Sequence, residues 1–151
     1  MSDFECMEEA LAEARLAAAA GEVPIGAVVA REGVIVGRGQ NRVLRDLDPT
    51  AHAEIVALRA ASAAVGNYRL AGCSLYVTLE PCAMCAGAMI HARLDKLFFA
   101  ASDPKTGAAG SVLEVINHPG LNHRMLVEQG ILRGESAELL RSFFRARRQS
   151  E

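Results

Sequence analysis

Two cysteines stand three positions apart, Cys82 and Cys85, in the segment EPCAMC that follows the apolar run CSLYVTL. That run is typical of a strand, and the residues after the pair are typical of a helix. The fold must therefore place both thiols where a strand ends and a helix begins. A Cys-x-x-Cys pair serves as a redox dithiol, as half of a structural zinc site, or as part of a catalytic zinc site.

The sequence around the pair favours a catalytic metal site. Ala83 and Met84 lie between the two thiols and offer no cation to lower a thiol pKa, which weakens the redox interpretation. A four-cysteine zinc site needs a second close pair, whereas Cys6 and Cys73 are far apart and sit in helix and strand patterns that suit buried packing. A disulfide framework is also not expected in a chain of this composition. The remaining interpretation is a two-cysteine site completed by a histidine, with a position open to water or substrate.

Four histidines could complete that site: His52, His91, His118 and His123. His52 stands out because it begins a predicted helix in PTAHAE, two residues before Glu54. If His52 and the two cysteines hold a metal, Glu54 is the nearest carboxylate in sequence that could act as a base. The alternatives are simple packing for the histidine and a favourable helix-dipole contact for the glutamate. Residues two apart on a helix point to different sides, so their convergence depends on how the helix end faces the metal.

Apolar periodicity predicts an alternating order of helices and strands. The expected elements are a helix at about 3–20, two short strands around a turn at Glu32-Gly33, a helix from Asp48-Pro49-Thr50 to about Ala64, a strand at 73–79, a helix at 83–94, a strand at 95–100, a short strand near 125–127 and a last helix from about Glu135. This order predicts an α/β sandwich with a partly parallel sheet. With 151 residues, 51% of them apolar, a single domain over 1–151 is expected.

Charge is distributed unevenly along the chain. Residues 1–40 carry a net charge of −4 and residues 124–151 carry +2, within a total of −2 that argues against a general nucleic-acid binder. The acidic start and the lack of a long apolar run predict a cytoplasmic protein without a membrane span. Near the C-terminus Arg141, Arg145, Arg147 and Arg148 flank Phe143 and Phe144. This patch could bind phosphates and stack on bases, or it could be a solvated last helical turn.

The segments HAE and PCAMC together resemble the zinc-dependent nucleobase deaminases of the cytidine/deoxycytidylate deaminase superfamily. Nearly the whole chain resembles the bacterial tRNA adenosine deaminases within it, through GEVPIGAVV, NRVLRDLDPTAHAEI, NYRLAGCSLYVTLEPCAMCAGAMIHARL, DPKTGAAGS, NHPGLNHR and FFRARR. The short signature indicates the superfamily, and the longer segments indicate the adenosine of a tRNA. Ser102 and Pro104 depart from the usual pattern of the loop around Asp103.

The resemblance implies a three-layer α/β/α sandwich with a mixed sheet of about five strands, and a homodimer. It implies Zn²⁺ held by His52, Cys82 and Cys85, zinc-bound hydroxide as nucleophile, and Glu54 as proton shuttle. The implied reaction converts the wobble adenosine of a tRNA anticodon stem-loop, that of an arginine tRNA, to inosine. The residues implied to contact the RNA are Asn41 at the flipped adenosine, Asp103 and Asn122 along the anticodon-loop groove, and Phe144, Arg147 and Arg148 on the last helix.

Two other functions share parts of this pattern. A deaminase of a free base or nucleotide, such as cytosine or guanine, would use the same zinc site without a basic C-terminal patch. A non-catalytic zinc-binding module would share the ligands but would have no use for a glutamate beside an open coordination position.

Overall fold

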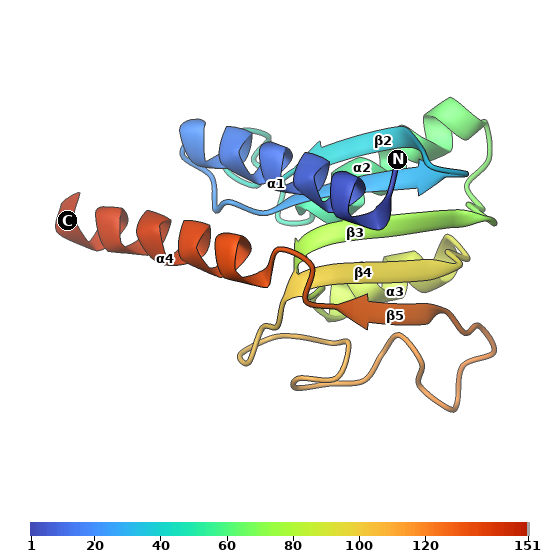
Figure 1. Ribbon diagram of the computed structural model, residues 1–151. Helices are drawn as coiled ribbons and strands as arrows, with labels where there is room; N and C mark the ends of the chain where they lie inside the picture. Colours follow the sequence, from blue (N-terminus) through green and yellow to red (C-terminus); the bar gives the residue numbers. More distant parts are fainter. Residues whose placement is uncertain (151) are drawn as a thin grey trace.

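The computed structural model describes residues 1–150, and these form one mixed sheet covered by helices on both faces (Figure 1). The elements are α1 (Asp3–Ala19), β1 (Gly26–Arg31), β2 (Val34–Gln40), α2 (Ala53–Val65), β3 (Cys73–Leu79), α3 (Ala83–His91), β4 (Lys96–Ala101), β5 (Leu126–Gln129) and α4 (Arg133–Ser150). The predicted order of helices and strands is confirmed over these residues.

The sheet has the strand order β2-β1-β3-β4-β5. β1 pairs antiparallel with β2 and β3, whereas β3, β4 and β5 run parallel to one another. The parallel pair β3 and β4 is joined through α3, as expected for parallel strands, which need a crossover rather than a hairpin. The predicted mixed sheet of five strands is confirmed.

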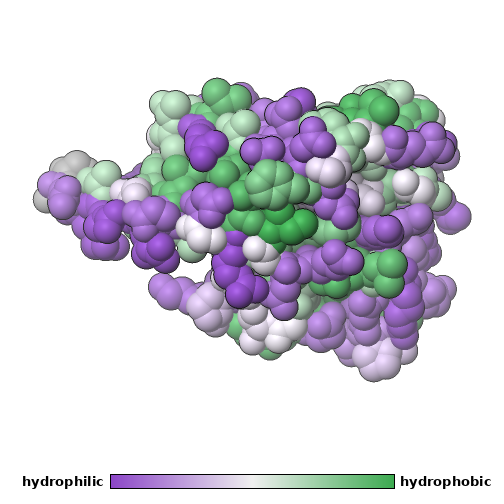
Figure 2. Space-filling view, in the orientation of Figure 1, coloured by the Kyte–Doolittle hydropathy of each residue, from purple (hydrophilic) through white to green (hydrophobic). Residues whose placement is uncertain are grey.

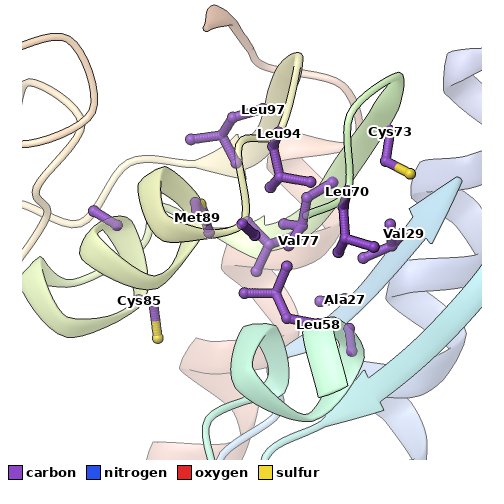
Figure 3. Packing of buried hydrophobic residues seen from close by; sticks show 14 of the residues in the cluster. Ala27, Val29, Leu58, Leu70, Cys73, Val77, Cys85, Met89, Leu94 and Leu97 are labelled. Atoms are coloured by element: carbon purple, nitrogen blue, oxygen red, sulfur yellow. The ribbon is translucent and has the colours of Figure 1, made fainter. Parts of the chain in front are cut away.

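Side chains that alternate along the strands divide the core into two layers. Ala27, Val29 and Val77 face α2 and α3, where Figure 3 shows Leu58 and Met89 close to them. On the other face, residues of α1 and the segment before α4 pack on the sheet: these are Cys6, Met7 and Ala10 with Val28, Ala30, Tyr76 and Phe98, and Ile131 and Leu132 at the edge. The fold is the predicted three-layer sandwich.

Two glycines let α2 lie directly on β2. A Cβ atom at Gly39 would come within 2.3 Å of the Ala53 carbonyl oxygen, and one at Gly37 within 2.5 Å of the Ala57 carbonyl oxygen. Real Cβ atoms do not approach backbone this closely, so any side chain at either position would push the helix away from the strand. The contact at Gly39 fixes the first residue of α2, which follows His52.

The structure corrects two predicted helix boundaries. The helix predicted from Asp48-Pro49-Thr50 begins only at Ala53, because the Asp48 carboxylate accepts hydrogen bonds from the Thr50 amide at 2.8 Å and hydroxyl at 2.7 Å and so closes a separate turn. The helix predicted over 83–94 ends at His91, because Arg93 takes a left-handed conformation with φ of 58°. A capping box between Ser2 and Glu5 begins α1.

The segment from 102 to 125 is mostly turns, with an isolated bridge between Ala109 and Glu114. It connects β4 to β5 along the lower edge of the sheet in Figure 1. Among residues 1–150, no helix is both long and apolar enough to cross a bilayer.

We expect Gly39→Ala to lower the free energy of unfolding by about 1–3 kcal/mol, as overpacking of a tight contact typically does. The matched control is Gly134→Ala in α4, where an added Cβ meets no atom within 4 Å. Urea unfolding of both variants measures the difference. Equal midpoints for the two variants would show that α2 can move away from β2 at little cost.

Candidate functional site

The first residues of α2 and α3 lie together at one end of the strands. They bring together three side chains that could bind a metal. His52 is the N-cap of α2 and Cys82 is the N-cap of α3, both with extended backbone and neither with a side-chain cap hydrogen bond. Cys85 lies in the first turn of α3 and is fully buried. The positive ends of two helix dipoles therefore lie beside these thiols, an environment that favours thiolate.

The three donor atoms are close enough to share one cation. The Nδ1 atom of His52 lies 3.7 Å from the Sγ atom of Cys82 and 3.4 Å from that of Cys85. All three donor atoms lie within 4.8 Å of one another. Among the described residues this is the group of histidine, cysteine and carboxylate side chains that could hold a metal, so the predicted cluster is brought together by the fold.

The two thiols differ in their protonation. Hydrogen bonds from Cys85 and His52 lower the pKa of the Cys82 thiol to about 3. The hydrogen bond with the Cys82 thiolate and burial raise the pKa of the Cys85 thiol above its usual value. One thiolate is thus already favoured by the arrangement of the protein's own groups, and a bound cation would favour the second.

Glu54 lies beside the cluster, as predicted, and its side chain is buried at 4% exposure. Burial raises the pKa of its carboxyl to about 7, while His52 opposes that rise. Its carboxyl also contacts the Cys85 thiol. The concern that residues two apart on a helix diverge does not apply, because His52 has ψ of 154° and stands outside the helix.

Glu80, which the sequence interpretation did not identify, holds the loop after β4. Its buried carboxylate accepts hydrogen bonds from the backbone amides of Asp103, Ala109 and Ser111, at 3.0, 3.0 and 3.1 Å, and from the Ser111 hydroxyl. Burial alone would raise the pKa of the Glu80 carboxyl, but the hydrogen bonds from Ser111, Asp103 and Ala109 hold it below its usual value. The only sequence signal was its place immediately before Pro81-Cys82.

Asn41 lies next to the segment that carries His52. The backbone amide of Arg42 donates to the Ala51 carbonyl at 2.9 Å, so the residue after Asn41 pairs with the residue before His52. The Asn41 side chain is mostly buried, and its amide oxygen accepts from the Val43 backbone amide at 3.2 Å. The structure therefore links Asn41 to the start of α2 through one backbone hydrogen bond of its neighbour.

A groove of about 880 Å³ separates α4 from the loop at 101–106, and Figure 2 shows the surface hollowed beneath the projecting, mostly hydrophilic end of α4. Its lining includes three of the predicted RNA-contacting residues, Asp103, Phe144 and Arg148. The Asp103 carboxylate is engaged within its own loop, where it accepts from the Lys105 and Thr106 amides and from the Thr106 hydroxyl. It therefore shapes the groove wall.

The structure does not gather all of the predicted RNA-contacting residues in this groove. The Arg147 guanidinium lies 5.4 Å from the centre of the Phe143 ring, outside the lining. Asn122 accepts a 3.5 Å hydrogen bond from Arg93, just past the C-terminal end of α3. That end is about 13 Å along the helix from Cys82 and about 9 Å from Cys85.

The comparisons with known proteins agree with this geometry. The sequence matches the MafB19-like deaminase family over residues 1–148. It is 46% identical to the tRNA-specific adenosine deaminase of Haemophilus influenzae, over 99% of this chain and 87% of the relative. It is 49% identical to that of Agrobacterium fabrum, over 94% of this chain and 93% of the relative.

Solved structures with the same fold include two kinds of deaminase. A structure from studies of A-to-I editing by tRNA:A34 deaminases at the wobble position superposes with a TM-score of 0.87 at 47% identity, covering 90% of this chain and 99% of that one. A guanine deaminase from Nitrosomonas europaea superposes with a TM-score of 0.81 at 29% identity, covering 94% of this chain and 84% of that one. Sequence, fold and the histidine–cysteine cluster agree, and the chain belongs to the deaminase family, among the relatives of the tRNA-specific adenosine deaminases.

Proposed function

We propose that this protein is a zinc-dependent hydrolase that converts adenosine to inosine at the wobble position of a tRNA. The observation that carries the proposal is the cluster of His52, Cys82 and Cys85 with the buried Glu54 carboxyl beside it. The tRNA substrate is supported by the near full-length similarity to tRNA-specific adenosine deaminases. The sequence resemblance further implies an arginine tRNA.

The donor set fits zinc. One nitrogen and two sulfur donors match the three-ligand catalytic zinc sites, which leave a fourth position for water or substrate. Tetrahedral coordination with bonds of about 2.0 Å to nitrogen and about 2.3 Å to sulfur puts those atoms about 3.5 Å apart. The N–S distances of 3.4 and 3.7 Å agree with this spacing. Zinc bound in such a site lowers the pKa of water and so supplies hydroxide near neutral pH.

Glu54 is the group that can move protons during the reaction. Its carboxylate accepts a proton from the attacking water and donates it to ring nitrogen N1 as a C–O bond forms at C6. It then takes the remaining proton of the C6 hydroxyl and gives it to the amino group. The C–N bond breaks as a C=O bond forms at C6, so that adenosine and water give inosine and ammonia. The burial of the Glu54 carboxyl supports the proposal, because a carboxyl shielded from water can both accept and donate a proton.

The groove beside α4 supports a large polyanionic substrate over a free base. Its lining combines four cations with one aromatic ring: Lys105, Arg141, Arg145, Arg148 and Phe144. Cations can bind phosphates while the ring stacks on a base. A free base would need none of these groups. Turning the target base out of the anticodon stack costs a few kcal/mol, which contacts to the RNA backbone can offset.

We also propose that the protein works in the cytoplasm as a homodimer, as the resemblance implies. The exposed apolar side chains of Val112 and Leu113, on the segment that Glu80 holds, support an interface with a second copy of the chain. A second copy would remove these side chains from water.

The substrate is tested with the zinc-loaded protein and an anticodon stem-loop that carries adenosine at the wobble position. We expect inosine in the stem-loop and no ammonia from free adenosine, guanine or cytosine. Mass spectrometry of the digested RNA and an ammonia assay measure the products. Ammonia from free guanine or cytosine, with the stem-loop unchanged, would overturn the RNA substrate and keep the deaminase chemistry.

Replacing the carboxyl at the site should separate catalysis from metal binding. We expect Glu54→Ala to retain zinc and to lower kcat by about 10²–10⁴-fold or more, the range that general acid–base catalysis contributes. Glu8→Ala, which removes an exposed carboxylate from α1, is the control and should keep full activity. Loss of zinc from Glu54→Ala would mean that the carboxyl is a ligand rather than a proton carrier.

Removing a ligand should remove the metal. We expect Cys85→Ser to lose most of its zinc, because two strong donors remain where three are needed. Cys73→Ala, which removes a buried thiol of β3 outside the cluster, should keep one zinc per chain. Elemental analysis of the purified proteins measures the stoichiometry. Full occupancy in Cys85→Ser would refute the proposed ligand set.

A further inference from the structure

A second buried carboxylate, that of Glu22, organises the loop between β2 and α2. Glu22 lies before β1 and is 1% exposed. Its carboxylate accepts hydrogen bonds from the backbone amides of Leu44 and Arg45, at 3.1 and 2.9 Å, and from Nε of the Arg45 side chain at 3.1 Å. A buried carboxylate without such partners would be costly, so these contacts strongly favour one conformation of the loop.

The Arg45 guanidinium extends this contact back to the end of β2. Its Nη2 atom donates to the Asn41 carbonyl oxygen at 2.6 Å and to the Gln40 amide oxygen at 2.9 Å. The same planar group thus bonds Glu22 through Nε and two residues at the strand end through Nη2. A lysine could not make both sets of bonds, because its single ammonium lacks the spread of a guanidinium.

Asn41 is held from both sides by these interactions. The backbone amide of Asn41 donates to the Ile25 carbonyl oxygen at 3.1 Å, next to β1. The backbone amide of the following residue, Arg42, donates to the Ala51 carbonyl oxygen. Ala51 directly precedes the metal ligand His52. The bond from Arg45 to the Asn41 carbonyl therefore fixes the peptide that carries the Asn41 side chain relative to the metal cluster.

We propose that Arg45, held by the buried Glu22, is a positioning residue that sets Asn41 against the base being deaminated. This inference rests on the proposed function and on the contact between Asn41 and the flipped adenosine that the sequence resemblance implies. Arg45 acts through Asn41, because its bonds reach the carboxylate and the strand end, and its side chain is only 28% exposed. A displacement of about 1 Å at such a contact can cost about 10²-fold in rate.

The test is a double-mutant cycle on zinc-loaded protein, with kcat and KM measured on the anticodon stem-loop. We expect Arg45→Met to lower kcat/KM by about 10–100-fold. In an Asn41→Ala background the same change should have little further effect, because the side chain that Arg45 positions is gone. We expect Arg45→Lys to lower kcat/KM as Arg45→Met does, because a lysine lacks the forked geometry of the guanidinium. The lysine variant keeps the positive charge, so it takes the place of the methionine variant in the cycle if that variant folds poorly.

Arg42→Met is the matched control, since it removes one cation from the same loop. The Arg42 side chain pairs with Asp46 at 3.1 Å and forms a hydrogen bond with neither Glu22 nor Asn41 among the described residues, and Glu22 acts on it only through its charge. It should keep wild-type kcat/KM. An equal loss in Arg42→Met would show that the loop charge attracts RNA, and independent losses from Arg45→Met and Asn41→Ala would show that Arg45 does not act through Asn41. Either result overturns the proposal.

A protein that leaves the stem-loop unchanged but deaminates a free base would overturn the RNA substrate alone. The same cycle is then measured on that base, because Arg42, the residue after Asn41, pairs with Ala51 beside His52 whichever base is the substrate. Non-additive losses would still support Arg45 as the positioning residue, and additive losses would still refute it.

Discussion

The contact between β2 and α2 determines where the candidate active site lies. Without side chains at Gly37 and Gly39, the backbone of the helix rests on the strand, and the start of α2 is fixed over the end of the sheet. The parallel connection from β3 through α3 to β4 brings the start of α3 to the same end of the sheet. The ligands then need only be N-cap and first-turn residues of these two helices, because the packing of backbone on backbone has already set their separation.

Two buried carboxylates hold loops in place, as the glycine contacts hold α2 on β2. Glu22 and Glu80 are both nearly inaccessible, and each accepts hydrogen bonds from the backbone of an irregular segment. Irregular segments lack the hydrogen-bond ladders that order strands, so a buried acceptor can substitute for a ladder. Removing these acceptors would leave several half-buried backbone amides without a partner in the protein. The loops beside the candidate metal cluster are therefore ordered by buried acceptors rather than by a hydrogen-bond ladder.

The sequence predicted the regular elements and the grouping of His52, Cys82 and Cys85, because both leave a local pattern. Apolar periodicity gave the order of elements, and the histidine and the cysteine pair at helix starts gave the cluster. The predicted start of α2 was wrong because an aspartate such as Asp48 can either cap a helix or close a turn. Which of the two it does depends on tertiary packing. Glu22 and Glu80 were missed because their partners are backbone amides between 22 and 31 residues away, which no pattern in the sequence marks.

The candidate metal donors and the groove are carried by different elements of the fold. The donors that could hold a metal and Glu54 are carried by α2 and α3, whereas the groove is formed by α4 and the loop at 101–106. Substitutions in α4 or in the loops can alter the shape and charge of the groove without moving a ligand, because the ligands depend on the contacts of the helices with the sheet. Related folds that include both tRNA:A34 and guanine deaminases agree with such an arrangement. Arg45 lies in neither set of elements but in the loop between β2 and α2, and in the proposal it acts on the position of Asn41 rather than on the donors.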